Sequence, residues 1–331
     1  MTVPHGSMHA VVMHERGGPE VLRYEQVAIP RPLPGEARVR VRAATVNHTD
    51  LFHRAGRFFI QKPLPHILGM DLAGEIAALG DAAVVDWRIG DRVVATFEAL
   101  GRERDGAYAQ YTTVPVAQLR RIPDGLDFVS AASVGLAFTT AWIALMYDAQ
   151  LGHHERVVVH AASSGVGTSA LQIARWRGAQ VVAVSDADKA ERLRELGAAQ
   201  VIDRRAEPLA ESINAALGGL GATVVLDLVG RATLQTSIDV LARGGRVICA
   251  GTLSGDVAEI NVMDLLMKGG TIKGTFDTIQ TADYDRILQL FAQGTFRAVV
   301  DAEMPLSDAR LAHERIEARQ NFGKIVLIPP S

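Results

Sequence analysis

The stretch that most constrains the fold is residues 156–186, which read RVVVHAASSGVGTSALQIARWRGAQVVAVSD. The β-branched run 157–159 predicts a buried strand, and a loop of small residues follows it. Apolar residues at helical spacing from Thr168 predict a helix that Gly178 ends, before a second apolar strand at 181–184. Strand, loop, helix and strand within about 30 residues are typical of a dinucleotide-binding βαβ unit.

The loop of this unit predicts a phosphate-binding site. A helix N-terminus offers unpaired N–H groups and a positive dipole end, which a pyrophosphate reaches only where side chains are small. The three glycine positions of the usual fingerprint are Ala162, Ser164 and Gly167 here, so a tight turn without a ligand stays an alternative. The predicted phosphate contacts are Ser163, Ser164, Gly165, Val166 and Gly167. Ser164 stands at a glycine position of the fingerprint, and its hydroxyl can donate a hydrogen bond to the phosphate.

Residues 124–277 predict a doubly wound α/β domain around this unit. Apolar strand patterns alternate with helical patterns, which is typical of a parallel sheet with helices on both faces. A long apolar helix at 128–150 opens the domain, after a turn at Pro123-Asp124-Gly125 that marks its expected boundary. The further predicted strands are 200–203, 223–227, 246–252 and 271–276.

Residues 1–123 and 278–331 predict a second, β-rich domain. Several short strands separated by turn residues indicate a compact, barrel-like arrangement. The carboxyl-terminal part adds two amphipathic helices, at 284–293 and 308–319, and a closing strand at 321–327. The predicted strands of the amino-terminal part lie at 9–14, 36–45, 68–79, from 90 onward, 107–114 and 119–122.

Composition excludes several classes of function. The net charge of −3 and the dispersed arginines give no basis for binding nucleic acid or an anionic membrane. No uninterrupted apolar run reaches the roughly 18 residues of a membrane span, and we expect no signal peptide. We expect the folded part to start at Met8, with residues 1–7 as a disordered leader or an expression remnant. The single cysteine, Cys249, excludes intrachain disulfides, and we expect a reducing, cytoplasmic setting.

Motifs in one order along the chain carry a family resemblance. They are MHAVVMHERGGPEVL, VNHTDL, PHILGMDLAGEI, IGDRVV, the glycine loop and the closing NFGKIVL. The chain resembles the medium-chain dehydrogenases/reductases, of the zinc-independent quinone oxidoreductase type, from Met8 to its end. The resemblance implies a GroES-like β-rich catalytic domain, a Rossmann coenzyme domain and a nicotinamide-dependent reductase without a metal.

The chain departs from the zinc alcohol dehydrogenases of the same superfamily, which hold a catalytic zinc on two cysteines and a histidine. The matching positions are Asn47, Met70 and a place within 134–138, where there is no cysteine. The cysteine-rich loop of the structural zinc is also missing, since residues 97–106 are short and lack cysteine. A substitute site would need separate loops to bring together His48, His53 and His66, and we do not expect it.

The resemblance places Asn47 and Asp50 at the floor of the catalytic cleft, near the nicotinamide. Asn47 can both donate and accept hydrogen bonds, so it can hold a substrate carbonyl. Asp50 can orient Asn47 or a water, and a helix N-cap role is an equal alternative. Relatives often have tyrosines near this corner, whereas this chain has Phe52, Phe58 and Phe59. These phenylalanines either make the pocket more apolar or belong to ordinary core packing.

The end of the second strand favours NADPH over NADH. An NAD enzyme has an acid there for the ribose 2′-OH, but this strand ends in Ser185. In the resemblance Lys189 binds the 2′-phosphate, and Arg204 can form a bidentate pair with it. Asp186 argues for NADH, and Lys189 also suits a solvated helix face. The further expected coenzyme contacts are Thr140, Gly251, Thr252, Phe276, Asn321 and Lys324. For Lys324, a solvent-exposed position at the end of a strand is an equal alternative.

The predicted activity is hydride transfer from NADPH to a quinone or another conjugated carbonyl, a small-molecule acceptor positioned by Asn47. The alternative enzyme is an enone or enoyl double-bond reductase, which needs a proton donor near Asn47. The alternative outside enzymes is a nucleotide-binding structural or regulatory protein with little turnover. The resemblance also implies a homodimer, for which 258–261 and 271–275 are candidate edge strands.

Overall fold

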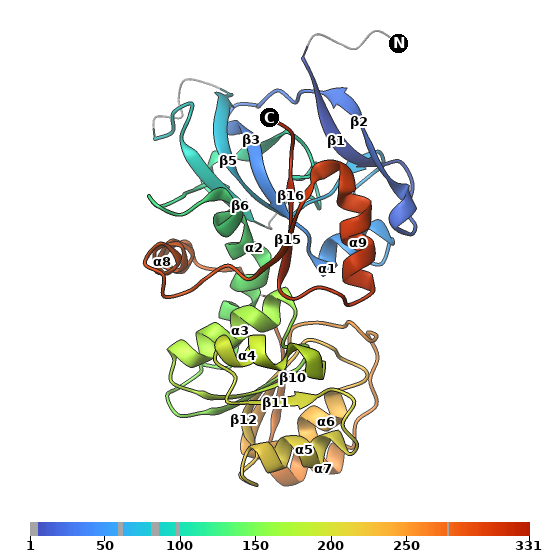
Figure 1. Ribbon diagram of the computed structural model, residues 1–331, viewed down its shortest axis with the longest axis vertical. Helices are drawn as coiled ribbons and strands as arrows, with labels where there is room; N and C mark the ends of the chain where they lie inside the picture. Colours follow the sequence, from blue (N-terminus) through green and yellow to red (C-terminus); the bar gives the residue numbers. More distant parts are fainter. Residues whose placement is uncertain (1–5, 59–61, 81–85, 97–99, 277) are drawn as a thin grey trace. The chain divides into compact units, whose positions relative to one another are not determined.

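The chain forms two compact units, shown in Figure 1. The computed structural model describes residues 6–58, 62–80, 86–96, 100–276 and 278–331. The first unit comprises Met1–Leu136 and Thr281–Ser331, and the second comprises Ala137–Gln280. The first unit therefore runs on past the turn expected to separate the domains. Parts of three predicted features lie outside the described residues: the leader at 1–5, Phe59, and the 97–99 end of the short loop.

Two sheets build the first unit. In the smaller, β1 (Ser7–Met13) pairs antiparallel with β2 (Leu22–Ala28) and with β4 (His66–Ile67). The larger has seven strands in the order β15-β16-β3-β5-β6-β8, with β7 paired to β3. They are β3 (Glu36–Thr45), β5 (Asp71–Leu79), β6 (Arg92–Thr96), β7 (Tyr111–Pro115), β8 (Arg120–Arg121), β15 (Val300–Pro305) and β16 (Lys324–Ile328).

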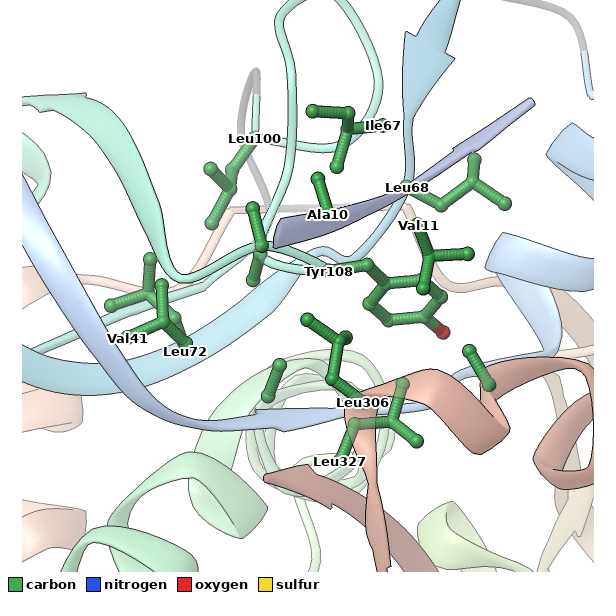
Figure 2. Packing of buried hydrophobic residues seen from close by; sticks show 14 of the residues in the cluster. Ala10, Val11, Val41, Ile67, Leu68, Leu72, Leu100, Tyr108, Leu306 and Leu327 are labelled. Carbon is green, nitrogen blue, oxygen red and sulfur yellow. The ribbon is translucent and has the colours of Figure 1, made fainter. Parts of the chain in front are cut away.

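The core of the first unit lies where alternating strand residues meet. β3 buries Ala37, Val39 and Val41 on one face, as its sequence pattern predicts. Figure 2 shows the ring of Tyr108 among the apolar side chains of this core. The helices of the unit are α1 (His48–Arg54), α8 (Thr281–Ala292) and α9 (Ala309–Glu317).

The second unit contains a six-stranded parallel sheet in the order β11-β10-β9-β12-β13-β14. This order is typical of dinucleotide-binding sheets. Figure 1 shows α3 and α4 on one side of the strands and α5 and α6 on the other. The strands are β9 (Arg156–Val159), β10 (Gln180–Ser185), β11 (Gln200–Asp203), β12 (Ala222–Asp227), β13 (Leu241–Cys249) and β14 (Thr271–Gly274). The helices are α3 (Gly165–Trp176), α4 (Ala190–Glu195), α5 (Leu209–Ala216), α6 (Leu234–Asp239) and α7 (Val262–Lys268).

The expected long apolar helix is α2 (Phe128–Trp142), which continues as a π-helical segment at Ile143–Asp148. Its backbone leaves the helical conformation at Gly135, so two helices meet there at a kink. Among the described residues, 128–148 alone has the length and composition that would suffice to cross a membrane. Most of this segment is buried within the protein, and the core helix of a globular protein meets the same criteria.

Several elements differ from the sequence predictions. β2 and β15 were not predicted, because both expose much of their surface and lack a clear alternation. The helix expected from Thr168 begins three residues earlier, at Gly165, and residues 258–261 form no strand. Short 3-10 helices lie at Pro19–Val21, Val116–Gln118, Ala187–Lys189 and Leu306–Asp308.

Candidate active site

Asn47 and Asp50 shape the turn at the start of α1. Asn47 has an extended backbone just before the helix, and its N–H donates to the Asp50 carboxylate at 2.9 Å. The other carboxylate oxygen accepts the N–H of Gly69 at 3.1 Å. Asp50 thus belongs to a capping box, with Asn47 rather than itself as the N-cap residue. It also joins the turn before α1 to the turn before β5.

The side-chain amide of Asn47 is fixed at both ends. Its Oδ1 accepts a hydrogen bond from Lys324 Nζ at 2.6 Å, and its Nδ2 donates to Asp71 Oδ2 at 2.8 Å. Because an ammonium can only donate, this pairing also determines which end of the amide is oxygen. One amide hydrogen remains that no described residue accepts. Asn47 therefore presents a single oriented N–H, the group that a carbonyl oxygen requires.

Asp71, at the start of β5, is the hub of this cluster. Its carboxylate is fully buried and accepts hydrogen bonds from Thr45, Asn47, Thr96 and the backbone N–H of Leu136. The Lys324 ammonium lies 3.7 Å from it. Lys324 is itself buried and donates to the carbonyl of Val46 at 3.1 Å. The alternative prediction, that its side chain lies in solvent at the end of a strand, is therefore wrong.

The kink in α2 serves the same carboxylate. A Cβ at Gly135 would lie 2.3 Å from the Asp71 carboxyl group, closer than real side chains approach. The non-helical backbone there is followed by the Leu136 N–H, which donates to Asp71 Oδ1 at 2.8 Å. Glycine at this position thus allows a backbone donor to reach a buried charge.

Burial governs the protonation of the cluster. Burial raises the pKa of Asp50 to about 7, helped by the charge of Asp71 and opposed by the N–H of Asn47 and by Lys324. Burial lowers the pKa of Lys324, against the effect of the two carboxylates. Burial also lowers the pKa of His48 to about 4, with Lys324 adding to the effect. The carboxyl group of Asp50 is therefore partly protonated near neutral pH, whereas the imidazole of His48 is neutral.

The donor set of this cluster does not fit a zinc ion. At the positions that the resemblance matches to zinc ligands, Asn47 has an amide and Met70 a thioether in place of a thiolate and an imidazole, and both oxygens of Asp71 accept hydrogen bonds. Over the described ranges, no three histidine, cysteine, aspartate or glutamate side chains group as a metal site. His66 uses both ring nitrogens, toward Asp105 and the carbonyl of Gly101.

The loop predicted to bind phosphate leads into α3 in the second unit. Ser164 is the N-cap residue, and its hydroxyl oxygen accepts the N–H of Gly167 at 3.1 Å. A Cβ at Gly167 would lie 2.5 Å from the carbonyl oxygen of Ala161, so this position requires glycine. Ser163 and Val166 border the same turn. The loop leaves the helix N-terminus free of bulky side chains, which is the condition for a bound pyrophosphate.

Cations gather beyond the end of β10. Arg204 pairs with Asp186 at 2.7 Å, and Arg205 lies 3.8 Å from the same carboxylate. Lys189 Nζ lies 3.5 Å from the Ser163 hydroxyl and 3.9 Å from Asp186. The structure thus places Lys189 at the edge of the loop, and Arg204 on the carboxylate of Asp186 that Lys189 also approaches. Asp186, the residue that argued for NADH, is engaged by these cations.

The other predicted coenzyme contacts are spread over both units. Gly251 and Thr252 follow the end of β13, Thr140 lies in α2, and Phe276 is largely exposed after β14. A Cβ at Gly251 would lie 2.5 Å from the carbonyl oxygen of Leu228. Asn321 belongs to the first unit, where its amide donates to the carbonyl of Gly323.

The sequence did not single out four buried polar residues. Asp71 follows directly after Met70 in a motif that carried the resemblance, which is the only signal that pointed to it. Tyr108 and His313 meet from distant parts of the chain, with Tyr108 Oη 3.1 Å from His313 Nε2. Asp227, at the end of β12, accepts hydrogen bonds from the following turn and from the start of α6.

Two family models match the chain. The model of the alcohol dehydrogenase GroES-like domain matches residues 33–124, and the model of the zinc-binding dehydrogenase matches residues 165–293. They confirm the expected pairing of a GroES-like domain with a Rossmann domain.

Known proteins are similar over nearly the whole length. A quinone oxidoreductase of Pseudomonas aeruginosa is 34% identical over 95% of this chain and 97% of its own. A 2-haloacrylate reductase of Burkholderia sp. is 32% identical, with 97% and 98% covered. The structure of a mycobacterial protein complexed with NADPH has a TM-score of 0.86 and 30% identity, over 97% of this chain and 100% of that one. The similarity therefore extends over both units.

Proposed function

Because this chain belongs to the quinone oxidoreductase family of the medium-chain dehydrogenases/reductases, we propose that it transfers hydride from NADPH to a quinone or a similar conjugated carbonyl. Membership also makes it an oxidoreductase that acts on small molecules, so the alternative of a structural protein with little turnover falls. The observation that carries the proposal is the oriented amide of Asn47, whose remaining N–H suits an acceptor carbonyl oxygen.

The coenzyme supplies the hydride when bound, and the chain binds it and orients the acceptor. The loop at the start of α3 suits a pyrophosphate, since its residues are mostly small and the helix packs so closely on it that a Cβ at Gly167 would lie 2.5 Å from the Ala161 carbonyl oxygen. Lys189 and Arg204 favour the 2′-phosphate of NADPH, and the mycobacterial relative with bound NADPH agrees with this choice. Lys324 polarises the Asn47 amide through Oδ1, which strengthens its N–H as a donor to the developing charge on the acceptor oxygen.

No zinc takes part in the proposed reaction. The cation beside Asn47 is the Lys324 ammonium, held by Asp71, and the cluster offers amide and thioether groups in place of metal ligands. We further propose a cytoplasmic homodimer. The exposed edge strand β14 and the apolar exposed side chains of α7 support the dimer.

Reduction of a conjugated carbon–carbon double bond is a second candidate. In that reaction hydride adds to one carbon and a proton to its neighbour, while NADPH is oxidised to NADP⁺. Lys324 Nζ, 2.6 Å from Asn47 Oδ1, and Asp50, with a pKa near 7, are proton carriers beside the proposed acceptor site. The similarity to a 2-haloacrylate reductase points in the same direction.

Steady-state oxidation of NADPH with a panel of acceptors tests the function. Turnover with simple quinones, and a smaller kcat/KM for enones and 2-haloacrylates, is the expected result. The reverse order would favour the double-bond reductase. Coenzyme binding without turnover of any quinone, enone or haloacrylate would overturn both. Activity should survive chelators, and a stoichiometric zinc ion in the purified enzyme would contradict the metal-free chemistry.

Lys189→Ala combined with Arg204→Ala tests the choice of coenzyme. Loss of two charge-assisted contacts should raise the KM for NADPH on the order of 100-fold, because each is worth about 1.5 kcal/mol or more. The KM for NADH should change by less than about threefold, since its ribose carries no phosphate for them to bind. Arg194→Ala, an exposed arginine of α4, is the matched control and should leave both values unchanged. Equal losses for the two coenzymes would refute the assignment.

A further inference from the structure

A chain of buried polar side chains leads from α9 to Asp50. Arg54 Nη1 lies 3.2 Å from His313 Nδ1, His313 Nε2 lies 3.1 Å from Tyr108 Oη, and Tyr108 Oη lies 3.4 Å from Asp50 Oδ2. All four side chains are essentially excluded from solvent. They come from α1, from the strand-like turn at Tyr108 and from α9, so distant parts of the first unit meet in this one chain. Arg54, Tyr108 and His313 have no role in the hydride transfer proposed above.

Arg54 sets the direction of the hydrogen bonds. Its guanidinium is held by the carbonyl of Gly17 at 3.1 Å and by the carboxylate of Glu317. A guanidinium only donates, so His313 Nδ1 must be the acceptor and the ring proton must sit on Nε2. Burial, with the charge of Arg54, lowers the pKa of His313 to about 3, so the ring stays neutral. Nε2–H then donates to the oxygen of Tyr108.

Tyr108 passes this direction on to Asp50. Its oxygen accepts from His313, which leaves the hydroxyl proton for Asp50 Oδ2. Burial and the nearby carboxylate of Asp50 raise the pKa of Tyr108 well above its usual value, so the hydroxyl keeps its proton. Figure 2 shows the ring packed in the core, with the hydroxyl oxygen pointing away from Leu100 and Ile67. The Tyr108 and His313 rings also make an edge-to-face contact, with ring centroids 5.8 Å apart.

We propose that His313 is a positioning residue, which directs the Tyr108 hydroxyl onto Asp50 and so holds the turn that presents the Asn47 amide. The proposal rests on the proposed function, because it assigns His313 an effect on the acceptor through Asn47. Asp50 is the link, since its carboxylate binds the N–H groups of both Asn47 and Gly69. The Tyr108 hydroxyl, directed at Oδ2, adds a further restraint on the orientation of this carboxylate. α9 thereby contributes to the acceptor site without touching the acceptor.

The chain is a clamp rather than a path for protons. A proton passed from His313 to Tyr108 could be replaced only from Arg54, and a guanidinium does not give up its proton in proteins. The other charged or titratable groups that act on these two side chains are Asp71 and Lys324 at Asp50 and the neutral His48 at His313. Substitutions of these hydrogen-bonded side chains should therefore change the position of the Asn47 amide. They should lower kcat/KM for the acceptor and leave the affinity for NADPH unchanged.

Three variants test this clamp. His313→Leu removes both ring nitrogens, and we expect kcat/KM for a simple quinone to fall about tenfold, as one lost hydrogen bond in the site implies, with the KM for NADPH unchanged. His313→Gln retains an acceptor for Arg54 and a donor for Tyr108, and should recover most of that loss. Tyr108→Phe should match His313→Leu, and the double variant should be no worse than either single one. Equal activity of the Leu and Gln variants, or additive losses, would overturn the proposal.

A spectroscopic measurement separates this proposal from the proposed function. ¹⁵N NMR of histidine-labelled wild-type enzyme should show His313 neutral, with the proton on Nε2, from pH 5 to pH 9, and its signal is assigned by its loss in His313→Gln. A proton on Nδ1, or titration in that range, would overturn the clamp even if quinones are reduced. If no quinone is reduced but the Nε2 form is seen, the proposed function fails instead. Thermal unfolding of each variant identifies losses that come from misfolding.

Discussion

At the scale of single residues, the proposed acceptor site contains buried charges that are compensated to different degrees. Lys324 and Asp71 form an ion pair, and hydrogen bonds from Thr45, Asn47 and Leu136 satisfy the carboxylate. A buried charge that is paired and fully hydrogen-bonded is tolerated, whereas an unpaired one is costly. No cation in the described part of the chain forms an ion pair with Asp50, and burial raises its pKa to about 7 although the charge of Lys324 opposes this.

Asp50→Asn tests this imbalance through stability. A carboxyl whose pKa is raised in the folded protein destabilises it progressively as pH rises from about 4, its unfolded pKa, to about 7. The amide carries no charge and escapes this loss. The thermal midpoint of the variant relative to wild type should therefore rise by about 3 °C between pH 5 and pH 8. Calorimetry at the two pH values measures the difference.

Asp127→Asn is the matched control for that experiment. Burial acts to raise the pKa of Asp127, but hydrogen bonds from Ser130 outweigh this effect and hold the pKa below its usual range. Its stabilisation is complete above pH 4 and is lost only at lower pH. The variant should be less stable than wild type by the same amount at pH 5 and pH 8. A flat difference for Asp50→Asn as well would show that Asp50 does not titrate between pH 5 and pH 8 in the folded protein, which contradicts a pKa of about 7.

At the scale of elements, the kink in α2 is set by one glycine. Gly135→Ala would place a methyl group 2.3 Å from the Asp71 carboxyl group. We expect a loss of about 3 kcal/mol in the free energy of unfolding, since overpacking a tight site costs this much. Urea denaturation measures it. Gly152→Ala, whose added Cβ meets nothing closer than 3.7 Å, should change stability by less than about 1 kcal/mol, and equal effects would contradict the assigned role.

The sequence predicted elements better than it predicted contacts. The βαβ unit, the parallel sheet and β3 follow from local apolar patterns, and the structure confirms them. The kink at Gly135 left no trace in the apolar pattern of α2, because its cause is a carboxylate on another element. Tyr108 and His313 are 205 positions apart, so no local pattern could pair them. Asn47 and Asp50 were found only because a family motif marks that corner.

At the scale of the whole molecule, each unit carries one half of the proposed chemistry. The first holds the cluster around Asn47, and the second holds the phosphate loop and the cations near Arg204. The sheet of the second unit also ends on β14, which pairs with β13 and follows α7 and its apolar exposed side chains in the chain. An edge strand next to an exposed apolar surface favours association with another chain, and sheet edges are commonly closed in this way.

Leu266→Arg with Met267→Arg tests whether a second copy covers this surface. Both side chains are at least 65% exposed in the single chain, so charges there should leave the fold intact and disrupt only an interface. Light scattering should give about twice 35.5 kDa for the wild type and 35.5 kDa for the variant. Leu33→Arg, at a 65% exposed leucine of the first unit, should remain dimeric. A monomeric wild type would remove the proposed dimer, and a dimeric double variant would move its interface to another surface.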